Sequence, residues 1–301
     1  MGSTAERAFV HDGITQDVRL DGRRRGDLRP LTLTQGVLHH VAGSAQLRLG
    51  GTEVLVAVRC DVDAAAEGDP HSGRLVVTVE LADGAASGDS LAAHDWEGEL
   101  AGALASCYAS PGGAGAVCRG ESTGGVALDW RSLGVIPGRK AWLLGLDAVV
   151  LSDDGAVLDA LSIAAKAALA DTVLPELLVT AAAADAAAAQ TGHSDFELGN
   201  AMRRLDVSAV PVIVTVCRIG AHHVLDASAA EVVHADAQLW AAVTPAGDVS
   251  ASGTAATVAV PPGATHDMLA AARDTGRVMH AAIQAHLRTA KSLVAKPTIH
   301  G

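Results

Sequence analysis

Hydrophobic and polar positions alternate most clearly over residues 35–60, in a pattern typical of β-strands. Two leucines alternate with polar neighbours before Gly50 and Gly51, and an apolar run rich in valine follows. Two short strands joined by Gly-Gly predict a tight hairpin, because such a turn takes positive φ at both central residues. Strands are also predicted at 74–81 and 141–151.

Helical spacing of small and apolar residues follows these strands. It covers 90–106, and it returns at 158–175 in a helix of small residues that can lie close to a sheet. We expect this second helix to end just before Pro175, since proline cannot continue it. The glycine-rich stretch 111–125 is predicted to be a loop.

The second half of the chain repeats the plan of the first. Strands and turns are predicted at 209–228 and 237–253, and a long helix from Thr265 to about Ala290, with Thr265 as its N-cap. The apolar stripe of this helix, at spacings of three and four, consists of Met268, Ala272, Gly276, Met279, Ile283 and Leu287. Strands followed by helices, twice over, predict an α+β protein of two similar halves.

An alanine-rich stretch, TAAAADAAAAQTGHSD, separates the two halves and has no apolar stripe to anchor it as a helix. We therefore interpret it as a connection. The expected organisation is an N-terminal extension at 1–20, a first half at 21–178, the Ala-rich connection at 179–195 and a C-terminal half at 196–301.

Composition limits the function classes. The 301 residues carry a formal net charge of -12, which disfavours a stand-alone nucleic-acid binder, because phosphate contacts from Lys and Arg dominate such binding. A basic groove on an acidic subunit stays open. Hydrophobic residues make up 49%, enough for a large core, whereas aromatics at 2% argue against a stacking platform for single-stranded bases.

The four cysteines, Cys60, Cys107, Cys118 and Cys217, form no CxxC pair, so we expect reduced, buried thiols. No apolar run approaches the 18 or so residues that a membrane span needs. The sequence therefore leads us to expect a soluble, intracellular protein without membrane contact.

Searches for catalytic and cofactor motifs give little. GGAGAVCRG lacks the Lys-Ser/Thr of a phosphate-binding P-loop, and no GxSxG is present. The pairs His39-His40 and His222-His223 lie in strand-like runs, where neighbours point to opposite faces and cannot chelate one ion. We expect no cofactor and no metal.

A series of motifs in a fixed order resembles a known family. Asp21-Gly22-Arg23 and Arg29-Pro30 open the series. It continues with GSAQLRLGGTEVLVAV, IPGRKAWLLGLDAVVLSDDG, LDALSIAAKAALADTVLP and VPVIVTVCRIGAHHVLDASAAE. The chain, over about residues 15–290, resembles RNase PH-type domains and, among them, core subunits of the eukaryotic RNA exosome.

The resemblance implies two βαβα-like halves with mixed sheets covered by helices, and a place in a hexameric ring of RNase PH-like subunits around a pore. It further implies cap subunits with RNA-binding domains, associated exoribonucleases and RNA as partners. Nucleus, nucleolus and cytoplasm are the locations implied.

Active members of this family hold phosphate in a Gly-Ser/Thr-Arg loop before the small-residue helix. The matching positions here are Ala156, Val157 and Leu158, which carry neither a hydroxyl nor a guanidinium. An uncharged, apolar trio lacks the groups that stabilise a phosphate. We therefore expect this part of the site to be lost.

Two further family elements differ. Glu97 and Gly98 stand where active members carry arginines, and Asp226 matches the first of two acidic residues, but Val232 stands at the second. With three elements missing, the resemblance implies no catalytic residue and a non-catalytic ring subunit that supports 3'-to-5' RNA processing by partner nucleases. The alternative is an inactive partner that contributes RNA-binding residues to a phosphorolytic heterodimer. A chance match by an unrelated α+β binding protein is a third hypothesis.

Basic residues are the remaining candidates for RNA contact. In DGRRRGDLRP, Arg24 and Arg25 lie between the signature positions and are free to face solvent or RNA, whereas the signature arginines are expected to be structural. Arg131, Arg139 and Lys140 complete the predicted RNA-binding set.

Overall fold

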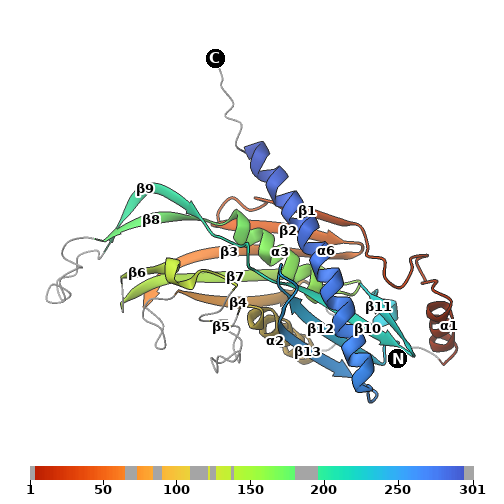
Figure 1. Cartoon of the computed structure of the whole chain (residues 1–301). Helices are drawn as coiled ribbons and strands as arrows, with labels where there is room; N and C mark the ends of the chain where they lie inside the picture. The colour runs from red at the N-terminus through yellow and green to blue at the C-terminus, as the bar shows by residue number, and fades with distance from the viewer. Residues whose placement is uncertain are drawn as a thin grey trace.

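The protein is described by a computed structural model that covers residues 4–64, 73–83, 90–108, 121–122, 127–136, 139–179 and 196–294. Two sheets and the helices between and over them form the body, and a two-stranded hairpin extends from one end (Figure 1). The α+β class agrees with the prediction, and so does the mixed sheet of the first half, whereas the sheet of the second half is purely antiparallel.

The first half is built on a mixed seven-stranded sheet in the order β1-β2-β3-β7-β4-β5, with β6 paired to β7. β4 runs parallel to β7, and the other pairs are antiparallel. The strands are β1 (Leu31–Gln35), β2 (Gly43–Leu49), β3 (Thr52–Ala64), β4 (Arg74–Leu81), β5 (Glu121–Ser122), β6 (Gly134–Ile136) and β7 (Lys140–Ser152). The strands predicted at 74–81 and 141–151 are confirmed.

The hairpin between β2 and β3 turns at Gly50 and Gly51, as predicted. Only Gly50 takes a positive φ, of 59°, so the expectation of positive φ at both glycines is wrong. Gly51 is needed for space instead, because a Cβ there would lie 2.7 Å from a carboxylate oxygen of Asp154. The turn therefore packs against the segment that precedes the next helix.

Helix α2 (Ser90–Ser106) has the predicted bounds, whereas α3 (Val157–Asp171) ends earlier than expected. Thr172 ends α3, with its Oγ1 donating to the Ala168 carbonyl at 2.8 Å, and the following residues enter a strand. β-branched Thr and Val favour this change over another helical turn. The α3 segment 159–170 is buried throughout, and its alanines let the helix lie against both β2 and β10.

The second sheet is antiparallel, in the order β11-β10-β12-β13. Its strands are β10 (Val212–Ile219), β11 (His222–Leu225), β12 (Ala237–Val243) and β13 (Val249–Ala256), with α5 (Ala229–Val232) between β11 and β12. Helix α6 (Pro262–Val294) crosses β10 and β12 and begins three residues before the predicted N-cap, because Pro262 is favourable in the first turn. Its predicted stripe faces the core, with Met268 and Ala272 fully buried.

Strands β8 (Val173–Val179) and β9 (Phe196–Arg204) form an antiparallel hairpin that extends from the body (Figure 1). Residues 180–195, most of the Ala-rich connection, lie outside the described residues. The two flanks of this segment therefore pair with each other, although the boundaries of the halves stay a prediction. Within the loop expected at 111–125, Glu121 and Ser122 pair with β4, and the other residues are not described.

Three further outcomes concern local predictions. Helix α1 (Thr4–Thr15) lies in the expected extension and buries Val10 and Ile14 against β10 and β11. His39 and His40 lie in a turn between β1 and β2, so their expected place in a strand is wrong.

No helix in the described part of the chain is long and apolar enough to cross a membrane.

Of the cysteines, Cys107 and Cys217 are buried free thiols, and burial raises the pKa of each to about 12. Cys60 is half-buried and free. Cys118 lies outside the described residues. The expectation of reduced, buried thiols therefore holds fully for two of the four positions.

Candidate functional site

Asp226 is the centre of a buried ion network that holds two of the four arginines in the stretch DGRRRGDLRP. Arg29 donates to it from the backbone N and from Nη2, both at 2.6 Å, and Arg23 donates from Nη1 at 3.0 Å. Asp226 is 3% exposed and takes a φ of 48° after β11. The signature arginines are therefore structural, as expected, and they join the N-terminal segment to the second half.

Arg29 also reaches the turn before α3. Its Nη1 donates to the Asp154 carbonyl at 2.7 Å and its Nη2 to the Gly155 carbonyl at 3.0 Å. Burial alone would lower the pKa of Arg29, but the hydrogen bonds and charge of Asp226, with Asp154, raise it overall. Arg29 thus fixes the backbone at the position where active members of the resembled family bind phosphate.

A second buried pair, Arg19 with Glu231, was missed by the sequence analysis. Arg19 Nη2 lies 2.5 Å from one carboxylate oxygen and Nε 2.8 Å from the other. Glu231 also completes the capping box of α5 by accepting from the Ser228 backbone N at 2.9 Å. The local pattern, Ser228 three residues before Glu231, indicates a capping box. It carries no information about an arginine 212 positions away.

The start of α3 is closed by apolar side chains. Ala156 takes a left-handed conformation (φ 54°) and makes no side-chain cap, Val157 is buried, and Leu158 packs against the core. None of these side chains has a donor to offer an anion. The first buried polar group of the helix, Asp159, accepts from the backbone N of Thr215 at 3.0 Å, and burial raises its pKa to about 7.

The other two positions compared with active relatives also have local roles. Glu97 on α2 accepts a hydrogen bond from the backbone N of Leu81 at 2.9 Å, so it caps the end of β4. Val232 packs against the apolar cluster beneath α1. Asp226, the one acidic residue retained, is already occupied by Arg23 and Arg29.

The predicted RNA-binding residues divide between two places. Arg24 and Arg25 lie beside α1 and β11, at one end of the molecule. Arg24 is exposed, whereas Arg25 is half-buried and pairs with Asp17 and with the His222 ring. Arg25 is therefore less available to RNA than Arg24.

Arg131, Arg139 and Lys140 lie at the opposite end, in the 3-10 helix η2 (Trp130–Leu133) and where β6 leads into β7 (Figure 1). Arg131 is exposed, and its guanidinium has no hydrogen-bond or ion-pair partner among the described residues. Lys140 lies near enough to lower the pKa of Asp63, after the stronger effects of the Ala64 backbone and Arg74. These cations form one basic rim.

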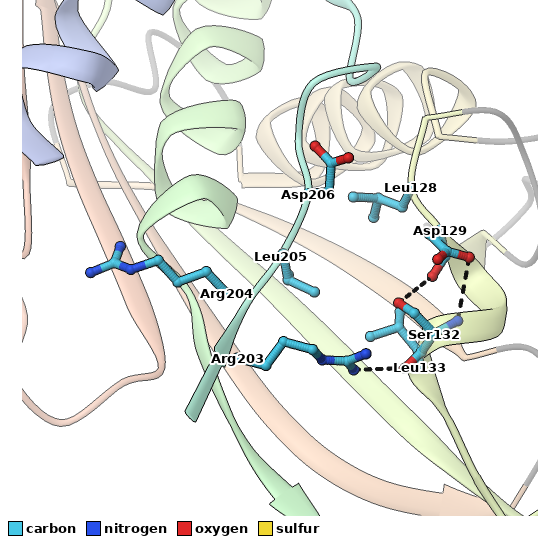
Figure 2. Close-up of a pocket in the computed structure, with 8 residues that line it drawn as sticks. All are labelled: Leu128, Asp129, Ser132, Leu133, Arg203, Arg204, Leu205 and Asp206. Carbon is cyan, nitrogen blue, oxygen red and sulfur yellow. Dashed lines mark hydrogen bonds between the residues drawn. The ribbon is translucent and has the colours of Figure 1, made fainter. Parts of the chain in front are cut away.

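A cavity of about 230 Å³ opens beside this rim, between η2 and the end of β9 (Figure 2). Arg203 points toward η2 and donates from Nη2 to the Ser132 carbonyl at 2.6 Å, whereas Arg204 points away and bonds the Ala170 carbonyl. Asp129 lines the cavity from the η2 side and Asp206 from the segment that follows β9. Arg203 was not among the residues predicted from the sequence, because no local pattern indicates that β9 lies next to η2.

A buried basic pair connects the two halves elsewhere. Lys166 on α3, 1% exposed, donates to the Val210 carbonyl at 2.5 Å and lies 3.1 Å from His280 Nδ1. His280 on α6 donates from Nε2 to the Val243 carbonyl at 2.7 Å, so Nδ1 is the acceptor. Burial lowers the pKa of Lys166 to about 8 and, with the charge of Lys166, that of His280 to about 4.

No cluster of three or more His, Cys, Asp or Glu side chains suited to a metal occurs within the described ranges. The exposed cations Arg131 and Arg203 have the charge that binds phosphate groups, and Asp129 and Asp206 line the same cavity as Arg203.

Comparisons with known proteins identify the family. Residues 27–175 match the model of the 3' exoribonuclease family, domain 1. The exosome complex component Rrp42 of Sulfurisphaera tokodaii is 31% identical over 242 residues, which cover 79% of this chain and 78% of that protein. A putative exosome complex exonuclease RRP42 of Dictyostelium discoideum is 26% identical, over 80% of this chain and 84% of that one.

Among solved structures, an archaeal exosome core chain has a TM-score of 0.71 at 22% identity, over 93% of this chain and 96% of that chain. That likeness shows the fold, with both halves aligned. Taken with the extent of the similarity to the Sulfurisphaera protein, it confirms the resemblance read from the motifs. This chain belongs to the RNase PH family.

Proposed function

We propose that this chain is a non-catalytic subunit of an exosome-type ring. It pairs with other RNase PH-like chains, supports 3'-to-5' RNA processing and degradation by partner nucleases, and helps line the path of the RNA. The relatives named Rrp42 support the assembly. Cap subunits with RNA-binding domains and associated exoribonucleases are the expected further partners, in the nucleus, nucleolus and cytoplasm.

The observation that carries the non-catalytic assignment is the start of α3. Ala156, Val157 and Leu158 present methyl and methylene groups where phosphate would be held, and Leu158 packs into the core. Phosphorolysis needs groups that stabilise the charge of the attacking phosphate, and apolar groups cannot do so. Asp226, bonded to Arg23 and Arg29, is not free to act as an acid.

The experiment is to purify the chain alone and co-expressed with RNase PH-like partners, and to incubate each preparation with uniformly labelled RNA and inorganic phosphate. We expect no nucleoside diphosphate from the chain alone, and a stable ring by light scattering in the co-expressed sample. Release of nucleoside diphosphates by the isolated chain would refute the proposal.

The heterodimer hypothesis makes a different prediction in the same assay. If this chain contributes RNA-binding residues to a partner's site, phosphorolysis appears only in the co-expressed sample. It then weakens when Arg24 or Arg131, which are exposed cations, is replaced by alanine. Unchanged activity in both variants would leave the purely structural role.

A further inference from the structure

Arg218 and His223 form a pair of basic side chains outside the regions described so far. Arg218 lies on β10 and His223 on β11, and the two residues are partners in the antiparallel register. Residues directly opposite each other in such a register have Cβ atoms about 5 Å apart and point to the same face. The two side chains are therefore neighbours on one face of the second sheet.

This face is the one that α6 covers. Val216, two residues before Arg218, packs in one apolar cluster with Met268 at the start of α6. Thr215 points to the opposite face, where its Oγ1 donates to Asp159 of α3. The sheet thus separates the pair from the start of α3, where active members of the family hold phosphate.

Each side chain of the pair buries a nitrogen that has no hydrogen-bond partner among the described residues. These atoms are Arg218 Nε and His223 Nε2. The arginine nitrogen is a donor, and the histidine nitrogen is a donor whenever the ring is protonated. A buried donor without a partner is costly, so such groups in native proteins are rare and indicate a bound water or ion. Two of them on neighbouring side chains indicate one shared binding place.

Asp236 does not neutralise the pair, although it is attached to the same strand. Its backbone N donates to the Arg218 carbonyl at 2.8 Å. Its carboxylate, however, accepts from Arg7 at 2.8 Å and from the Gly220 N at 2.7 Å. This acidic group is therefore already bonded elsewhere.

The other carboxylate that acts on the pair is Asp267, on the exposed side of the first turns of α6. Burial lowers the pKa of His223, Arg218 and His222 lower it further, and Asp267 offsets this only in part. Within the described ranges, Asp267 forms no ion pair with Arg218 or with His223. The Arg218 charge thus lacks a bonded counter-ion in this part of the chain.

An anion suits this place better than a water molecule does. A water molecule can accept from both nitrogens, but it leaves the charge of a half-buried guanidinium uncompensated. An oxyanion accepts the same two bonds and supplies the missing charge. Charge-assisted hydrogen bonds of this kind are stronger than neutral ones.

We propose that Arg218 and His223 bind one tetrahedral oxyanion, either inorganic phosphate or the phosphate monoester of a nucleotide, on the α6 face of the second sheet. Arg218 donates through Nε and His223 through Nε2, with the imidazole protonated in the bound state. The inference does not rest on the proposed function, because it concerns neither the ring contacts nor the path of RNA.

The test is an NMR titration of the full chain with isotope-labelled histidine rings, in which His223→Gln identifies the His223 signals. Sulfate is the first probe, because it is a tetrahedral dianion that does not titrate near neutral pH. It should shift the His223 signals saturably and raise the pKa of His223, because a bound anion favours the protonated ring. Sulfate affinity should accordingly increase as pH falls through this pKa.

Substitutions then assign the two donors, with sulfate affinity measured by calorimetry. Arg218→Gln should weaken binding roughly 10-fold or more, because it removes a charged donor. His223→Gln should weaken binding roughly 3-fold and abolish the pH dependence, because glutamine donates but does not titrate. The matched control is Arg277→Gln, at an exposed arginine of α6 paired with Asp274 at 4.0 Å, and it should change affinity less than about 2-fold.

Phosphate and adenosine monophosphate distinguish the two sources of the oxyanion. Tighter binding of the nucleotide identifies a phosphate monoester as the ligand, and nucleotide affinity no greater than that of phosphate identifies the free ion. Thermal melts of each variant separate lost binding from lost folding. If Arg218→Gln does not fold, the wild-type titration and His223→Gln still test the inference.

Sodium chloride at equal ionic strength controls for screening. An equal response to chloride, or equal sulfate affinities of Arg218→Gln and Arg277→Gln, would overturn the inference. It is also overturned if no anion changes the pKa of His223 and that pKa rises only in the co-expressed complex, because the pair would then bind a carboxylate of a partner chain.

Discussion

Two groups of cations in this molecule have the same side-chain chemistry and opposite surroundings. Arg19, Arg23 and Arg29 are enclosed by the carboxylates of Glu231 and Asp226, and they hold segments together. Arg131 and Arg203 lie on the surface around η2, with spare donors. Burial and a carboxylate partner, not local arginine density, decide which arginines are structural.

Lys166 separates these two variables, because it is buried but bonds only neutral acceptors, the Val210 carbonyl and His280. If pairing is what makes the buried arginines important, removing a carboxylate should cost far more than removing Lys166. The following variants test this contrast.

The largest effect is expected from Asp226→Asn. Asparagine tolerates the positive φ at this position, so the variant mainly removes the charge and leaves Arg23 and Arg29 buried without it. Losing one partner of a buried ion network should lower the free energy of unfolding by about 3–5 kcal/mol, measured by urea denaturation. The control Asp63→Asn, from an exposed pair with Arg74, should cost about 1 kcal/mol or less. If Asp226→Asn and Asp63→Asn lowered the free energy of unfolding by similar amounts, the contrast between buried and exposed ion pairs would be refuted.

His280→Gln should alter the pH dependence of stability. The folded pKa of His280, about 4, lies below the ordinary 6.5, so between these values the unfolded chain binds a proton that the folded chain does not. The free energy of unfolding of wild type therefore falls as pH drops from about 6.5 to about 4, by an amount on the order of 2–3 kcal/mol.

Glutamine does not titrate, so this fall should disappear from the variant. Asp159, with a raised pKa of about 7, acts in the opposite direction in both proteins, which is why the difference between them is the useful quantity. Parallel stability curves for wild type and variant from pH 7 to pH 4, measured by thermal melts, would count against a buried neutral imidazole.

Lys166→Met should change the free energy of unfolding by only about 1 kcal/mol in either direction, because the lost hydrogen bonds are offset by relief of a buried charge without a carboxylate. The pKa of His280, followed by NMR, should rise toward its ordinary value once the adjacent positive charge is gone. A loss as large as that of Asp226→Asn would show that burial alone, without pairing, makes a cation indispensable.

The smallest effect on stability is expected from Arg131→Ala. Its guanidinium has no partner in the described part of the chain, so the free energy of unfolding should stay within about 0.5 kcal/mol of wild type. A cost above 1 kcal/mol in the same urea titration would place Arg131 with the structural arginines.

Elements with a strong periodic pattern were predictable from the sequence. The hairpin at Gly50 and Gly51, the strand at 74–81 and the buried stripe of α6 follow from local spacing, because that spacing determines which face meets the core. The helix ends were less predictable. Both α3 and α6 depart from expectation by about three residues, since caps and tertiary contacts decide where a helix stops.

Long-range partners were not predictable. The pairing of β8 with β9 spans the Ala-rich stretch, and Arg19 meets Glu231 from opposite ends of the chain. For the candidate surface, Arg131, Arg139 and Lys140 could be chosen as basic residues, but the role of Arg203 depends on a contact 71 positions away. Local composition carries no information on such contacts, so only the folded chain reveals them.

The bond between Arg29 and Asp226 also has a consequence for the order of events during synthesis. The two residues are 197 positions apart, so the N-terminal segment cannot complete its contacts until most of the chain has left the ribosome. Until then the Asp226 carboxylate is not available to orient the Arg29 guanidinium. The hydrogen bond from Arg29 to the Gly155 carbonyl therefore lacks this support. Domains usually fold from the N-terminus as they emerge. Here the contacts of Arg29 with Asp226 must wait for the second half, so the N-terminal segment stays incompletely bonded until late in translation.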